Sequence, residues 1–263
     1  MKWWNTYNLE LERWARWQIG PLTLFAQAKR HEWIFGWKTA DDPFQATLSI
    51  DVPSSAAPNP DDCTFSRYAV GDLNSRLELG PRLGDRPFIV RPDSQFFLLA
   101  GQETVLFVST VVWIATYLND CMDEPCTLLE LPARRPSDTW FGPNTLEGEL
   151  CYASRTSARI SLDLIERRPH RAVTPVEIRN LGSDTLPIDQ LRVPVPALSL
   201  YQDQDDRLWT DTVCFVREEG EREASLTVPE ASAHLPEDRT LLAPPRAAVE
   251  AGTIVEAFSR FLG

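Results

Sequence analysis

The most regular arrangement of possible metal ligands is an acidic loop at residues 201–207. Asp203, Asp205 and Asp206 offer carboxylate oxygens, the ligand type that Ca²⁺ prefers. The loop lacks the rest of the EF-hand pattern, because no glycine stands at the sixth place and no glutamate at the twelfth. We therefore interpret it as a solvated hairpin tip, with a cation site at these three residues as the alternative. A second acidic loop at residues 119–125 receives the same interpretation.

The cysteines and histidines show no catalytic or zinc-binding pattern. Cys121 and Cys126 have no second pair of matching spacing, so the ligand set of a zinc site is missing. Five irregularly spaced cysteines favour reduced cytosolic thiols over a disulfide framework. We interpret His31 and the basic segment 167–171, which contains His170, as solvated loops. We predict no catalytic residue and no cofactor, and an anionic contact at the basic segment is the alternative.

The tryptophans are concentrated near the N-terminus, where six of nine lie within the first 38 residues. Trp33 and Trp37 share one face of an alternating segment, and we expect them to fill a core. Trp3 and Trp4 stand beside polar residues at the end of the chain. Exposed aromatic side chains there would form a contact patch, so we predict a binding role for this pair.

The composition excludes several classes of protein. A formal net charge of −12 argues against binding to nucleic acid or to an anionic membrane surface, because both require a cationic surface. The longest apolar run, residues 104–118, is shorter than the roughly 20 residues of a membrane span. The first ten residues have no apolar core of a secretory signal. We expect a cytoplasmic protein without membrane insertion.

Alternating apolar residues at short spacing predict an all-β, mainly antiparallel fold. Leu22, Leu24 and Ala26 share one face of a strand, and the tip at residues 29–32 joins it to the next strand as a hairpin. The 21 prolines separate such apolar runs, as turns do. Many short strands are typical of a sandwich or a barrel, and we predict a β-sandwich.

A change of composition near residues 119–126 favours a division of the chain. We predict a Trp-rich half over 1–120, an immunoglobulin-like half over 121–240 and a C-terminal helix within 241–263. A half of about 110 residues matches the size of an immunoglobulin-like unit. One large sandwich is the alternative.

The last residues depart from strand alternation. After two prolines, apolar residues recur at helical spacing, with charged residues on the other side. The spacing predicts an amphipathic helix over 246–262. Its apolar face must be covered by the same chain or by a partner, and Phe258 is the candidate anchor for a partner.

Two resemblances support this interpretation. In segment 173–191 a strand ends at Asn180, a turn with Gly182 follows, and the next strand reads Leu-x-Ile-x-x-Leu. This segment resembles a hairpin of immunoglobulin-like sandwich modules. Residues 19–37 and 174–219 together resemble a family of uncharacterised prokaryotic soluble proteins. The resemblances imply a fold and no activity.

These features favour a protein that acts by binding rather than by catalysis. The expected partner is another protein or a second copy of the chain. The alternative is a carbohydrate-binding or carbohydrate-active protein that uses exposed tryptophan with Asp and Glu pairs. An enzyme needs a concave pocket with convergent polar groups, whereas an interaction module needs an apolar patch.

Overall fold

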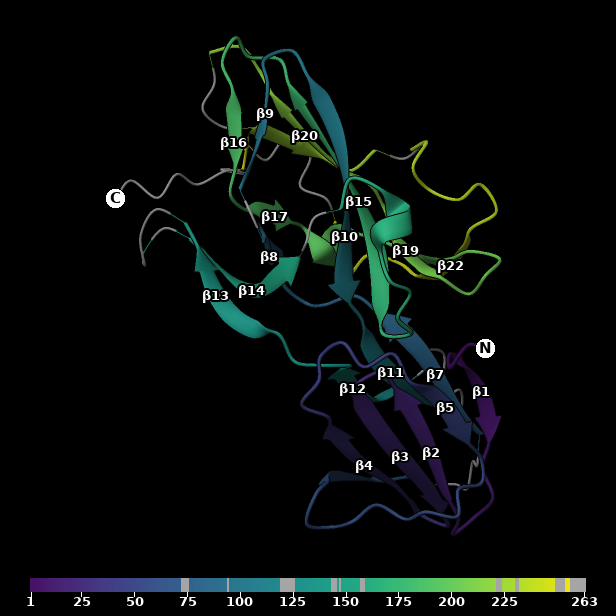
Figure 1. Cartoon of the computed structure of the whole chain (residues 1–263). Helices are drawn as coiled ribbons and strands as arrows, with labels where there is room; N and C mark the ends of the chain where they lie inside the picture. Colours follow the sequence, from purple (N-terminus) through teal and green to yellow (C-terminus); the bar gives the residue numbers. More distant parts are fainter. Residues whose placement is uncertain are drawn as a thin grey trace. The chain divides into compact units, whose positions relative to one another are not determined.

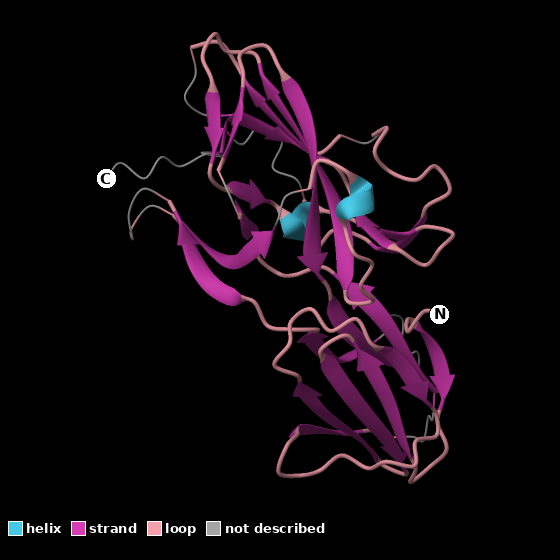
Figure 2. Ribbon diagram, viewed as in Figure 1, coloured by secondary structure: helices cyan, strands magenta, loops and turns pink. Residues whose placement is uncertain are grey.

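The computed structural model describes residues 1–71, 76–93, 95–118, 126–142, 146, 148–156, 159–220, 224–229, 232–248 and 254–255. Strands dominate these residues, and the described helices are two short 3-10 turns at Leu162–Leu164 and Val195–Ala197 (Figure 2). The all-β prediction is therefore confirmed. No helix in the described ranges has the length and apolar character needed to cross a membrane.

The chain forms two compact units, and each is assembled from separate segments. The first unit contains residues 1–82, 111–135 and 167–171, and the second contains residues 83–110, 136–166 and 172–263. The boundary expected after residue 120 therefore falls inside a segment of the first unit. The difference arises because strands far apart in the sequence pair within one sheet.

Two antiparallel sheets make up the first unit (Figure 1). Its strands are Asn5–Asn8 (β1), Trp14–Ile19 (β2), Leu22–Lys29 (β3), Glu32–Thr39 (β4), Leu48–Asp51 (β5), Thr64–Ala69 (β6), Arg76–Arg82 (β7), Trp113–Leu118 (β11) and Cys126–Pro132 (β12). One sheet has the order β5-β2-β3-β4-β6, and the other has the order β1-β7-β11-β12.

The core of the first unit forms around the central strand β3. This strand lies between β2 and β4, and its side chains are buried on both faces up to the last residue. β3 and β4 form the predicted hairpin, with Lys29 opposite Glu32. Trp33 is buried as predicted. The ring of Tyr7 on β1 meets the indole of Trp17 on β2 edge-on, with ring centres 5.2 Å apart.

Three sheets lie in the second unit. Its strands are Phe88–Pro92 (β8), Phe96–Leu98 (β9), Glu103–Val111 (β10), Ser137–Phe141 (β13), Glu149–Thr156 (β14), Arg171–Asn180 (β15), Leu186–Ile188 (β16), Leu191–Val193 (β17), Leu200–Gln202 (β18), Leu208–Thr210 (β19), Val213–Arg217 (β20), Ala224–Thr227 (β21), Thr240–Ala243 (β22) and Ile254–Val255 (β23). The largest sheet has the order β22-β18-β19-β15-β20-β21-β23, with β10 also paired to β15. The others are β13-β14-β8-β17 and β16-β9.

Parallel pairing occurs at the centre of the largest sheet. β15 runs parallel to β19 and to β20, and β14 runs parallel to β8 in another sheet. The other strand pairs with described registers are antiparallel, in agreement with a mainly antiparallel fold. On β15 and β20 the core face carries Ile178 and Phe215, so Glu177 and Cys214 point to the opposite face.

The segment 173–191 is not a hairpin, contrary to the prediction. β15 pairs within the largest sheet, whereas β16 pairs with β9 in a separate sheet. The side-chain amide of Asn180 accounts for the departure, because it donates to the carbonyl oxygens of Leu98, Leu99 and Asp184. These bonds hold the turn where the chain leaves one sheet for another.

The amphipathic helix predicted over 246–262 is not supported. Residues 246–248 are irregular, and Ile254–Val255 forms β23, which pairs antiparallel with β21. The same backbone groups cannot serve a helix and a strand ladder, so this pairing excludes one continuous helix. Phe258 lies outside the described residues.

Candidate functional site

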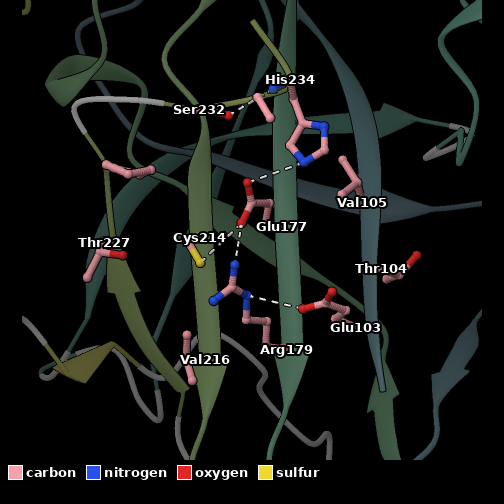
Figure 3. Close-up of a pocket in the computed structure, with 12 residues that line it drawn as sticks. Glu103, Thr104, Val105, Glu177, Arg179, Cys214, Val216, Thr227, Ser232 and His234 are labelled. Carbon is pink, nitrogen blue, oxygen red and sulfur yellow. Dashed lines mark hydrogen bonds and ion pairs between the residues drawn. The ribbon is translucent and has the colours of Figure 1, made fainter. Parts of the chain in front are cut away.

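A pocket of about 770 Å³ opens on one face of the largest sheet in the second unit (Figure 3). Strands β10, β15, β20 and β21 contribute most of its lining, and Pro229 and residues 232–234 contribute the rest. The opposite face of these strands is packed in the core. Strand alternation therefore turns Glu177 and Cys214 toward the pocket.

Glu177 lies at the centre of the polar side chains in the pocket (Figure 3). Its Oε1 atom is 3.4 Å from Nε2 of His234. Its Oε2 atom accepts from the thiol of Cys214 at 3.8 Å and from Nη2 of Arg179 at 3.3 Å. The side chain is only 16% exposed. The two distances to nitrogen exceed the about 2.7–2.9 Å of a strong charge-assisted bond, so this largely buried carboxylate is loosely bonded to His234 and Arg179.

Arg179 connects Glu177 to the rim of the pocket. Arg179 stands two residues after Glu177 on β15, so its side chain points to the same face of the sheet. Its Nε atom is 3.5 Å from Oε2 of Glu103 on β10. Glu103 is well exposed, whereas Arg179 is half exposed. Two carboxylates therefore share one guanidinium, which leaves a net negative charge in the pocket when His234 is neutral.

The thiol of Cys214 is not arranged as a nucleophile. It is buried, and burial followed by the negative charge of Glu177 raises its pKa. His234 contacts the carboxylate rather than the sulfur. A cysteine nucleophile needs a lowered pKa or an adjacent base, so this arrangement does not fit nucleophilic catalysis by Cys214.

Short polar contacts fix the position of His234. Its backbone N–H donates to Oγ of Ser232 at 3.2 Å, and the hydroxyl of Thr212 donates to the same oxygen at 2.8 Å. The imidazole also lies edge-on to the ring of Phe107, with ring centres 6.5 Å apart. The hydrogen bonds fix the backbone at His234, and the imidazole itself contacts Glu177 and Phe107.

The acidic loop at residues 201–207 is the hairpin tip between β18 and β19. Asp203 is used within the loop, because its carboxylate accepts from the backbone N–H groups of Asp205 and Arg207 at 2.9 and 2.8 Å. It also accepts from the indole N–H of Trp209 at 2.9 Å. Among the described residues, no group of three or more His, Cys, Asp or Glu is placed to hold a metal ion. The other acidic loop, residues 119–125, lies outside them.

Trp3 and Trp4 do not form the predicted exposed patch. Their exposed fractions are 0% and 7%, and their rings meet edge-on with centres 5.4 Å apart. The indole N–H of Trp3 donates to the carbonyl of Pro169 at 2.8 Å, and the hydroxyl of Tyr7 donates to the Trp3 carbonyl at 2.7 Å. A terminal position does not expose these rings, because β1 pairs with β7 directly after them.

The basic segment 167–171, expected to be solvated, contains a fully buried histidine. Nε2 of His170 lies 3.3 Å from the carbonyl of Pro43. Burial, and then the positive charge of Arg171, lowers the pKa of His170 to about 4. Its Nδ1 atom has no hydrogen-bond partner within the described ranges, and a Cβ at Gly20 would lie 2.1 Å from it. His170 is therefore a neutral packing group rather than an anion-binding one.

The residues of the pocket are not recognisable as a group in the amino-acid sequence. A signal for two of them was present, because Glu177 and Arg179 alternate with apolar residues along one strand, which marks a polar face. Glu103, Cys214 and His234 come from distant segments. Their convergence depends on the pairing of β15 with β20 and β10, which the sequence pattern does not specify.

The fold and the pocket define an all-β protein with a charge-lined cavity on an open sheet face of its second unit. The chain belongs to the family described as "Protein of unknown function (DUF432)", whose family model matches residues 3–262. The resemblance to an uncharacterised family is thereby confirmed. No curated protein and no solved structure matches the chain.

Proposed function

We propose that this chain is a cytoplasmic, non-enzymatic protein that binds another protein, and that the pocket of the second unit is its binding site. The apolar surface of Val105, Val216 and Pro229, which adjoins the charged side chains in the pocket, carries the proposal. A second copy of the chain is the other partner that this surface would accept.

The dimensions and lining of the pocket support this function. Its volume of about 770 Å³ lies within the range of about 300–1,000 Å³ that small-ligand pockets occupy, so it has room for a side chain of a partner. Val105 and Val216 place apolar surface beside the charged groups. A site that combines apolar walls with a few convergent polar groups can bury part of a partner and fix its orientation.

The test is to fill the pocket. Val216→Trp, opposite Arg179 in the strand register, places an indole in the cavity, and Leu241→Trp on exposed β22 adds the same side chain elsewhere. We expect quantitative affinity capture to recover a partner with the wild type and with Leu241→Trp but not with Val216→Trp. Sedimentation will show whether that partner is a second copy. Capture of the same partners by both variants would overturn the proposal.

Carbohydrate binding is the second candidate function. Of the nine tryptophans, all of which the structure describes, Trp140 alone is exposed, at 43%. It lies opposite Leu150, which is also exposed, in the β13–β14 pair. An exposed indole face beside an apolar neighbour can stack on a sugar ring. Quenching of tryptophan fluorescence by oligosaccharides, abolished by Trp140→Ala, would support it, and unchanged fluorescence would contradict it.

We also propose that the two sheets of the first unit form a β-sandwich. The edge-on contact between Tyr7 and Trp17, which stand on different sheets, supports face-to-face packing. Nuclear Overhauser contacts between these two rings are the expected observation. Their absence in a well-resolved spectrum would contradict the sandwich.

A further inference from the structure

We propose that the pocket binds a basic side chain, a lysine ammonium or an arginine guanidinium, carried by a segment of the partner protein. This inference rests on the proposed binding function and adds the chemistry of the ligand. The pocket is lined by two carboxylates, Glu103 and Glu177, and by one guanidinium, Arg179. The chain as a whole carries a net charge of −12. Both the local and the overall potential therefore attract a cation.

The bonding of Glu177 provides an independent argument. Its contacts with the nitrogen atoms of Arg179 and His234, at 3.3 and 3.4 Å, are long for a carboxylate that is only 16% exposed. In the same unit, the carboxylate of Asp211 accepts from the N–H of Ser199 at 2.6 Å and from the hydroxyl of Tyr201 at 2.9 Å. A buried carboxylate is stabilised by short charge-assisted bonds. A basic group would supply Glu177 with a short contact that the described part of the chain does not give it.

The apolar lining fits the rest of a basic side chain. Val105, Val216 and Pro229 line the same pocket as the carboxylates. Lysine and arginine lay their methylene stems along such surface while the charged head reaches a polar group. The volume of about 770 Å³ leaves room for neighbouring residues of the same segment. An anionic ligand, by contrast, would have to displace carboxylates from Arg179.

The probe is a fluorescein-labelled tetra-arginine peptide, titrated into the full chain at low salt and followed by anisotropy. Glu177→Gln preserves the shape of the side chain and removes its charge. We expect it to weaken binding about tenfold or more, since a hydrogen bond to a charged group is lost. Glu10→Gln, which removes the same charge from an exposed position of the first unit, is the matched control and should change affinity less than about twofold.

The outcomes separate the ligand chemistry from the binding function. Equal affinities of Glu177→Gln and Glu10→Gln would overturn the basic ligand. Tighter binding of a tetra-glutamate peptide, lost in Arg179→Met, would overturn it while leaving the pocket as a binding site. If thermal melting shows that Glu177→Gln is unfolded, the variant Glu103→Gln replaces it in the titration, because Glu103 is well exposed. We then expect Glu103→Gln to bind the tetra-arginine peptide more weakly than the wild type. The Val216→Trp capture experiment tests the binding function on its own.

Discussion

Single buried residues make the stability of the first unit depend on pH. The pKa of His170 is about 4 in the folded chain, against 6.5 for an unperturbed histidine. As the pH falls from 6.5 toward 4, the unfolded chain binds a proton that the folded chain does not. The free energy of unfolding should therefore decrease by about 3 kcal/mol over this window because of this one group. Urea unfolding at several pH values between 7 and 4 measures the decrease.

The substitution His170→Gln isolates this contribution from the carboxylates. The variant should lose part of the pH dependence between 6.5 and 4, because glutamine does not titrate. Identical pH profiles for the wild type and the variant would show that His170 does not remain neutral in the fold.

Gly20 is the second residue whose effect follows directly from local geometry. Its φ is +58°, and an added Cβ would lie 2.1 Å from the imidazole of His170. Gly20→Ala should lower the free energy of unfolding by about 2–4 kcal/mol, from overpacking together with backbone strain. Gly71→Ala is the control, because among the described residues other than its chain neighbours no atom lies within 4 Å of its added Cβ. Equal chemical-denaturation midpoints for the two variants would contradict the close approach.

At the scale of elements, Asn180 holds the turn between β15 and β16. Three carbonyl oxygens accept hydrogen bonds from its amide, and its side chain is buried. Asn180→Asp has the same size but brings a charged acceptor against those oxygens. We expect it to destabilise the second unit by about 3 kcal/mol or more, since buried charge and unsatisfied acceptors add. Thermal unfolding measures the loss.

Asn180→Ala provides the comparison for this substitution. Alanine removes the donors without adding charge, so it should be the milder variant of the two. If Asn180→Asp were the more stable of the pair, the amide would not be the donor that the hydrogen bonds require.

Local elements could be predicted from the sequence more fully than their pairing. The β3–β4 hairpin and the tip between β18 and β19 follow from alternation and turn residues over short spans. The parallel pairing of β15 with β20 leaves no comparable trace, because alternation shows which face is apolar and not which strand lies alongside. The same limit explains the C-terminal segment, where apolar spacing alone suggested a helix and Ile254–Val255 pairs as a strand.

The candidate site was predictable only in part for the same reason. The polar face of β15 can be read from Glu177 and Arg179, but the approach of Cys214 and His234 depends on long-range pairing. For Trp3 and Trp4 the sequence predicted exposure, because they stand near the end of the chain. Both are buried in the first unit, because β1, which follows them, pairs with β7.

At the scale of the whole molecule, the first unit is not contained in any single half of the chain. It requires residues 111–135 and 167–171 in addition to 1–82. A fragment of residues 1–120 lacks β12 and the Pro169 carbonyl that accepts from Trp3. We expect it to show collapsed amide dispersion in a nitrogen–proton correlation spectrum.

A matched chain joins residues 1–82, 111–135 and 167–171 through flexible Gly/Ser linkers. It retains the strands of both sheets and should recover dispersed resonances. Native dispersion of the 1–120 fragment alone would show that the later segments are dispensable to the fold.

The hydrogen bond from Trp3 to Pro169 has a consequence for synthesis on the ribosome. Trp3 cannot form this hydrogen bond until Pro169, which stands 166 positions later, has been translated. At about 5–20 residues per second, the N-terminal aromatic segment remains without this partner for on the order of ten seconds or more. During that interval Trp3 and Trp4, fully enclosed in the finished protein, are open to chaperones and to other nascent chains. Codon choice between the two segments should therefore affect the yield of soluble protein.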